Sequence, residues 1–251
     1  MTITTYSVEP SKSIDGAVKV PGDKSISHRS IILGSIADGV TRVRGFLEAE
    51  DTLNTLAAFQ SMGVKITGPN NGNVVIEGVG INGLLKPPEA LFMGNSGTAM
   101  RLLVGVLAGQ EFDSQLYGDD SLSNRPMGRV AEPLSKFGAV IEMENQEFPP
   151  LKVFGSQLTG VSYKLKIASA QIKSCLLLAA IFAKGKTTIT ELDLCRDHTE
   201  RMLEGFGYSI NQDKTVRKVS LEGGGRLTGT SIKVPGDISS AAFFIVAAAI
   251  S

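Results

Sequence analysis

Hydrophobic and polar positions follow one order that recurs about every 70 residues. Each copy has a strand, a Gly- or Ser-bearing turn and an Ala-, Leu- and Ile-rich helix, followed by a strand, a second helix and two strands. The first helices are predicted to begin near Ser25, Ser96, Ser169 and Ser239, at intervals of 71, 73 and 70 residues. Self-similarity at a fixed period indicates a repeat architecture, so we predict α/β units of the form βαβαββ.

The second helix of each copy ends on Phe or Met followed by Gly, at Gly63, Gly138 and Gly207. Gly favours a helix end because it accepts the left-handed conformation. Gly and Ala within the helices permit close packing, which predicts buried helices with sheets outside them. No GxGxxG follows a strand and no GxxxxGK[ST] is present, so a doubly wound nucleotide fold is disfavoured.

A fourth copy begins near the end of the sequence. KVPGD, at residues 19–23 of the first copy, returns at residues 233–237 and precedes the apolar stretch SSAAFFIVAAAIS. A helix with no strand to pack against would expose an apolar face, and a native domain seldom ends that way. We therefore expect three repeats plus the start of a fourth, in a truncated chain.

Bulk composition narrows the classes of function. Twenty-five basic and 25 acidic residues balance, with no basic excess of the kind that nucleic-acid binding requires. Cys175 lies in an apolar run, and neither it nor Cys195 suggests a disulfide framework or a metal site. The first residues do not resemble a signal peptide, and the longest apolar runs are too short to span a bilayer. We expect a soluble, cytoplasmic protein that binds neither nucleic acid nor membrane.

Two predicted helix starts carry residues suited to an anion. PGDKSISHRS places Lys24, Ser25 and Arg29 at the start of the first helix, where free backbone N–H groups and the helix dipole favour negative charge. GNSGTAMR at residues 94–101 occupies the equivalent position in the second copy, with small residues that let a ligand approach the backbone. Ordinary helix capping with solvated cations is the alternative explanation for both segments.

Three further segments add polar groups. Arg125 precedes Pro126 in a loop and could clamp a carboxylate or phosphate, although a lone surface arginine is commoner. Ser169-Ala170-Gln171 starts the first helix of the third copy, and CRDHTER adds Arg196, Asp197 and Arg201 at the start of its second helix. His28 and His198 have no neighbours typical of a catalytic triad or metal site, so no role is assigned to them. Together these segments favour a small molecule with several negative charges.

The motifs PGDKSISHR, GNSGTAMRLL, RPM, SAQIKSCLLLAA and RDHTER, in this order, resemble the EPSP synthase family over residues 20–251. The resemblance implies the enolpyruvyl transferase fold, with two lobes of three βαβαββ repeats. Residues 20–235 would form the N-terminal lobe, and residues 1–19 and 236–251 incomplete pieces of the second. The implied reaction transfers the carboxyvinyl group of phosphoenolpyruvate to the 5-hydroxyl of shikimate 3-phosphate, in the shikimate pathway to chorismate.

The resemblance also implies roles for individual residues. Lys24 and Gln171 would contact both substrates, and Lys24 would take part in catalysis. Shikimate 3-phosphate would further be bound by Ser25, Arg29, Ser169 and Arg196. Phosphoenolpyruvate would further be bound by Gly97 and Arg125, with Asn95 and Thr98 lining the same turn. Ala170 replaces a serine of other members, and Arg196 would compensate for the lost hydroxyl.

The implied chemistry is an addition followed by an elimination, with no cofactor and no metal. In the family an Asp and a Lys-Glu pair from the second lobe do the acid–base work, so this chain alone is predicted to be inactive and to need that lobe. The complete protein is expected to be a monomer. The family is a target of the herbicide glyphosate. Gly97 is the small residue typical of members that accept this herbicide.

Three other interpretations of the sequence are alternatives to an EPSP synthase. UDP-N-acetylglucosamine enolpyruvyl transferase shares the fold and donor but would carry Lys-Asn instead of Lys24-Ser25 and a Cys near Arg125. A half-length protein that binds shikimate 3-phosphate without turnover is the second alternative. The third, a purely structural repeat protein, would not need cations at several equivalent turns.

Overall fold

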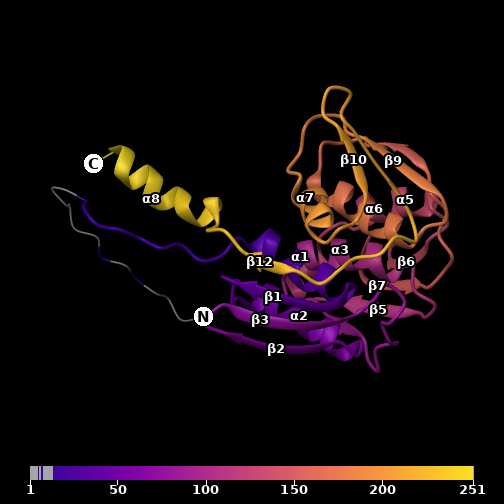
Figure 1. Ribbon diagram of the computed structural model, residues 1–251, viewed down its shortest axis with the longest axis horizontal. Coiled ribbons are helices and arrows are strands. Elements are labelled where there is room, and N and C mark those ends of the chain that lie inside the picture. The colour runs from indigo at the N-terminus through magenta and orange to yellow at the C-terminus, as the bar shows by residue number, and fades with distance from the viewer. Residues whose placement is uncertain (1–4, 6, 8–13, 251) are drawn as a thin grey trace.

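Three four-stranded sheets with one common strand order surround a helical interior (Figure 1). The computed structural model describes residues 5, 7 and 14–250. In each sheet the first two strands are parallel and the remaining pairs are antiparallel. The first sheet contains, in spatial order, β12 (Ser231–Lys233), β1 (Asp38–Arg44), β3 (Asn73–Val79) and β2 (Lys65–Asn70). The second contains β4 (Leu91–Phe92), β5 (Ser114–Tyr117), β7 (Phe148–Phe154) and β6 (Val140–Glu144). The third contains β8 (Ser162–Lys164), β9 (Lys186–Thr190), β11 (Lys218–Glu222) and β10 (Ile210–Asp213).

The first helix of each repeat lies in the interior. These helices are α1 (Lys24–Ser35), α3 (Gly97–Leu107) and α6 (Ala170–Phe182). In α6 every residue from 172 to 181 is buried, so the helix has core on all sides. The second helices are α2 (Glu50–Ser61), α5 (Gly128–Lys136) and α7 (His198–Gly205), and repeat two adds the short α4 (Asp120–Ser123). The predicted arrangement of buried helices and outer sheets is confirmed.

Polar caps explain where the interior helices start. The side chains of Asp23, Ser96 and Ser169 each accept a hydrogen bond from a backbone N–H in the first turn. The sequence analysis placed the first start near Ser25, but the cap is Asp23 and the helix begins at Lys24. Gly63, Gly138 and Gly207 follow the second helices with positive φ, as predicted.

The strand expected before the first helix comes from elsewhere in the chain. Residues 14–20 form no strand, and β12 fills that position, pairing in parallel with β1. The two KVPGD copies meet as an antiparallel bridge between Gly22 and Gly236. The Asp23 and Asp237 N–H groups donate to Pro235 and Pro21 at 2.8 and 2.9 Å. The chain thus returns to complete its own first sheet.

Beyond this bridge, α8 (Ile238–Ile250) projects away from the body (Figure 1). None of its described side chains is buried, and Phe243 is 81% exposed. Within residues 14–250 no helix has both the length and the apolar content needed to cross a bilayer.

A close backbone contact in the interior joins α3 to α6. Gly105 faces the backbone of Cys175, and a Cβ on Gly105 would overlap the Cys175 carbonyl oxygen. Burial raises the pKa of the Cys175 thiol to about 12, so this thiol stays protonated and packs as an apolar group. The absence of a side chain at Gly105 therefore sets how closely the two helices approach.

Candidate functional site

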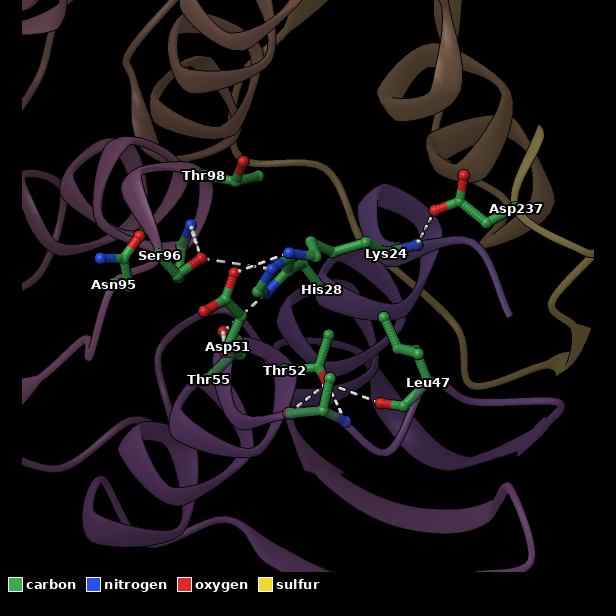
Figure 2. Close-up of polar contacts among 12 residues, drawn as sticks. Lys24, His28, Leu47, Asp51, Thr52, Thr55, Asn95, Ser96, Thr98 and Asp237 are labelled. Carbon is green, nitrogen blue, oxygen red and sulfur yellow. Dashed lines mark hydrogen bonds and ion pairs between the residues drawn. The ribbon is translucent and has the colours of Figure 1, made fainter. Parts of the chain in front are cut away.

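The Lys24 ammonium pairs with a carboxylate from the second helix of its repeat. Its Nζ lies 2.9 Å from Oδ2 of Asp51, and the Lys24 backbone N–H donates to the Asp237 carboxylate at 3.3 Å (Figure 2). The Lys24 side chain is still 48% exposed, which leaves room for a ligand. The role of Asp51 was not predicted, because the helix dipole favours an acidic residue in a first helical turn whatever that residue contacts.

Arg29 is buried, so it is not the solvated cation of the capping explanation. Its Nε donates to Thr199 Oγ1 at 2.7 Å, Nη1 to the Ser25 carbonyl at 2.8 Å and Nη2 to Ser174 Oγ at 2.8 Å. Burial lowers its pKa to about 10, although the charge of Glu200 opposes this effect. Arg29 remains cationic near neutrality and joins the start of α1 to α6 and α7.

Arg125 and the start of α3 form the second part of the site. The Arg125 guanidinium donates to both the carbonyl and the side-chain oxygen of Asn95, and Asn95 Nδ2 donates to Asp119 at 2.9 Å. A Cβ on Gly97 would lie 3.0 Å from Arg101 Nη1 and 3.6 Å from Arg125 Nη1. Gly97 therefore leaves space beside two guanidinium groups, where an anion could approach the backbone.

Gln171 joins the starts of α3 and α6. Its Nε2 donates to Thr98 Oγ1 at 2.9 Å, and its Oε1 accepts from Arg101 Nη1 at 2.9 Å. Burial lowers the pKa of Arg101, and the charges of Arg129 and Arg125 lower it further. Several cations held close together are stabilised by an anion, so this cluster is suited to anion binding.

The remaining predicted ligands flank this cluster. Ser169 caps α6, with its Oγ accepting from the Ile172 N–H at 3.4 Å, and Ala170 is the first helical residue. Arg196 is exposed on the loop between β9 and α7, and its charge contributes to the lowered pKa of Arg29. Arg196 thus lies on the α7 side of Arg29.

A buried lysine holds the loop that carries Arg196. The Lys173 Nζ lies 2.6 Å from Oε1 of Glu191, at the start of this loop, and 2.6 Å from Oε1 of Glu200, just beyond its end. The Lys173 side chain is 1% exposed. This role of Lys173 was not predicted, because the sequence of an apolar helix does not show which carboxylates its lysine will contact.

Hydrogen bonds join several of the predicted site residues in pairs. They join Ser25 to Arg29, Asn95 to Arg125, and Thr98 to Gln171. A series of contacts connects Lys24 to the start of α3 (Figure 2). It runs from Lys24 through Asp51 and Thr55 of α2 to His28 of α1, and from His28 to Ser96. Lys24 and Arg29 thus lie at the start of α1 and Arg125 at the start of α3, while Gln171 at the start of α6 accepts from Arg101.

His28 makes the stability of the fold sensitive to acid. Burial lowers its pKa from 6.5 to about 4; the charge of Asp51 opposes the shift, and those of Arg29 and Lys24 favour it. The unfolded chain binds a proton below pH 6.5, whereas the folded chain does so only near pH 4. Stability is therefore complete above pH 6.5, and about 3 kcal/mol of it is lost as the pH falls to about 4.

Urea unfolding of the 251-residue chain between pH 7 and pH 4 checks this expectation. His28→Gln should remove most of the pH dependence in this window. His198→Gln serves as the control and should remove less, because His198 is only partly buried, although burial lowers its pKa as well. An unchanged slope in His28→Gln would contradict the assignment.

Comparison with known proteins identifies the family of this chain. The family model described as EPSP synthase (3-phosphoshikimate 1-carboxyvinyltransferase) matches residues 8–251. The 3-phosphoshikimate 1-carboxyvinyltransferases of Hydrogenovibrio crunogenus and Ruthia magnifica are 59% and 60% identical over 250 residues. These alignments cover 98% and 99% of this chain but 56% and 57% of the relatives. A solved EPSP synthase from Acinetobacter baumannii superposes with a TM-score of 0.88 at 57% identity, covering 94% of this chain and 53% of that one.

Fold and site together define an α/β protein of the enolpyruvyl transferase fold, with cations gathered at the starts of its buried helices. The chain belongs to the EPSP synthase family. It spans about half the length of the curated relatives it matches.

Proposed function

We propose that this chain provides the substrate-binding repeats of a 3-phosphoshikimate 1-carboxyvinyltransferase. The whole protein transfers the carboxyvinyl group of phosphoenolpyruvate to the 5-hydroxyl of shikimate 3-phosphate, releasing phosphate. One observation carries this proposal: the cations and small polar residues of the family motifs converge at three neighbouring helix starts. Both substrates are anionic, and such a site favours phosphate and carboxylate groups.

The contacts support a division of the site between two ligands. Shikimate 3-phosphate lies on the α1, α6 and α7 side, bound by Ser25, Arg29, Ser169 and Arg196. Phosphoenolpyruvate lies at the start of α3, bound by Gly97 and Arg125, with Asn95 and Thr98 beside it. Lys24 and Gln171 contact both ligands. Of these residues, only Lys24 is proposed to act on the reacting atoms.

The reaction is an addition followed by an elimination. The methylene carbon of phosphoenolpyruvate gains a proton while the hydroxyl oxygen, which gives up its own proton, adds to the neighbouring carbon. The new methyl group of the tetrahedral intermediate then loses a proton as phosphate leaves, which restores the carbon–carbon double bond. Lys24 and Arg125 stabilise phosphate and carboxylate charge throughout these steps. The acid and base expected from the family lie outside these residues, so the 251-residue chain binds substrate without turnover.

The fold supports a division of the chain at its KVPGD copies. Residues 20–235 form the lobe of three repeats, because β12 completes the first sheet and the Gly22–Gly236 bridge closes it. Residues 236–251 belong to a second lobe, since α8 buries none of its described side chains against the first. Residues 1–19 are assigned there too, and most of that segment lies outside the described residues.

Calorimetry with shikimate 3-phosphate tests the proposal on the 251-residue chain. Arg196→Ala should weaken binding at least tenfold, because an exposed guanidinium bound to phosphate contributes about 1.5–3 kcal/mol. Arg226→Ala is the matched control, since Arg226 is exposed and pairs with Asp38, beyond the opposite end of α1. Equal affinity in Arg196→Ala and the unmodified chain would remove Arg196 from the site. An unmodified chain that binds no shikimate 3-phosphate would contradict the proposed function, and phosphate release by it would refute the need for a second lobe.

A further inference from the structure

His28 lies where three helices of the site meet. The imidazole projects from α1, with Nδ1 2.8 Å from Thr55 Oγ1 on α2 and Nε2 3.3 Å from Ser96 Oγ, the cap of α3 (Figure 2). The side chain is completely buried. A buried polar ring with a partner at each nitrogen has one fixed orientation.

The neighbouring hydrogen bonds determine which nitrogen carries the proton. Thr55 Oγ1 donates its hydrogen to the Asp51 carbonyl at 3.3 Å, so it accepts from His28 Nδ1–H. Ser96 Oγ accepts from the Ala99 N–H at 3.1 Å and is left to donate its hydrogen to Nε2. The arrangement is complete for a neutral imidazole protonated on Nδ1.

Each ring nitrogen of His28 is connected, through its hydroxyl partner, to residues of the proposed site. On the α2 side, Thr55 bonds the backbone of Asp51, whose carboxylate holds Lys24. On the α3 side, Ser96 lies between Asn95, which accepts from Arg125, and Gly97. The imidazole is therefore the link in a continuous chain of contacts from the Lys24 ammonium to the turn that meets Arg125.

We propose that His28 is a positioning residue that fixes the Lys24–Asp51 pair relative to the start of α3. It acts through Thr55 and Ser96 and touches no ligand itself. A leucine of similar size would fill the same volume but would leave both hydroxyls without their partner. The proposal rests on the proposed function only for the identity of the ligand, because the arrangement of the three helix starts is independent of what binds there.

Nitrogen-15 NMR of the 251-residue chain tests the tautomer. The chain has two histidines, so His198→Gln assigns the His28 signals without ambiguity. The expected result at pH 7 is a protonated Nδ1 and a bare Nε2. A proton on Nε2, or a doubly protonated ring at pH 6, would overturn the proposal whether or not the chain binds substrate.

Amide hydrogen exchange tests the positioning. In His28→Leu the Ala99 amide should exchange roughly tenfold faster, because Ser96 Oγ loses its fixed orientation, while amides in the middle of α6 keep their rates. His28→Gln, whose amide reaches the position of Nε2, should restore slow exchange at Ala99. A uniform acceleration along α3 and α6, or no change at Ala99, would make His28 a packing residue and overturn the inference.

Phosphoenolpyruvate binding in the presence of shikimate 3-phosphate supplies the functional readout. We expect the dissociation constant for phosphoenolpyruvate to rise at least fivefold in His28→Leu and to recover in His28→Gln. Shikimate 3-phosphate affinity should fall less, because this ligand shares Lys24 but does not contact the start of α3. Equal weakening of both ligands would contradict a role at the start of α3. If the unmodified chain binds neither ligand, the proposed function fails, and the tautomer and exchange measurements still decide the role of His28.

Discussion

Lys173→Met is expected to lower the free energy of unfolding by about 3–5 kcal/mol, because it leaves two buried carboxylates without their counter-ion. Glu191 and Glu200 are 9% and 2% exposed at their side chains, and the second oxygen of Glu200 has no hydrogen-bond partner among the described residues. Burial raises the pKa of Glu200, while the Lys173 ammonium opposes this shift. Urea unfolding at pH 7 measures the loss.

Two further variants separate the buried charge from other effects. Lys166→Met breaks an exposed pair with Glu132 and should change stability by no more than about 0.5 kcal/mol. Adding Glu191→Gln and Glu200→Gln to Lys173→Met removes the unpaired carboxylates and should recover part of the loss. A cost below about 1 kcal/mol for Lys173→Met would mean that the carboxylates bind protons or water instead. The Arg196 loop should also loosen, since Lys173 holds both of its ends.

Gly105→Ala is expected to cost about 3 kcal/mol, because the interior offers no room for the added methyl group. It would overlap the Cys175 carbonyl oxygen and lie 3.1 Å from the carbonyl carbon and 3.2 Å from Sγ. These first two atoms are backbone, so α6 as a whole must move away from α3. That movement would strain the Gln171 contacts with Thr98 and Arg101, so the site should loosen together with the core.

The matched control is Gly205→Ala in α7, where an added Cβ meets no atom within 4 Å. Alanine has the higher helix propensity, so this variant should be neutral or more stable by up to about 1 kcal/mol. Thermal unfolding of both variants gives the comparison. A Gly105→Ala protein as stable as the control would show that α3 and α6 separate at little cost.

Periodic features of the sequence predicted much of the fold. The recurring helix starts, the closing glycines and the burial of whole helices follow from local pattern and hydrophobicity, and the structure confirms them. The origin of β12 could not be predicted, because two copies of KVPGD are equally suited to precede β1. Only tertiary packing decides that the distant copy supplies the strand.

The candidate site, like the fold, could be predicted from the sequence only in part. Helix starts rich in Lys, Ser and Gly predicted Lys24, Gly97 and Gln171 as neighbours of a ligand, and the structure places these residues at the starts of the interior helices. The partners that orient them were missed, since Asp51 is 27 residues from Lys24 and Ser96 is 68 residues from His28. Arg29 shows what the sequence could not predict. Its motif indicated either a residue that binds an anion or a solvated cation, whereas three of its nitrogens donate hydrogen bonds to other residues of the protein.

The pairing of β12 with β1 also orders events during synthesis on the ribosome. While the chain emerges, β1 is available early, but its parallel neighbour follows only after about 190 further residues. Until then one edge of the first sheet is open, and an open edge can pair with other chains. The second and third sheets draw their strands from nearby sequence and can close as they emerge. We therefore expect the first sheet to be the last to become complete, although three of its four strands are made first.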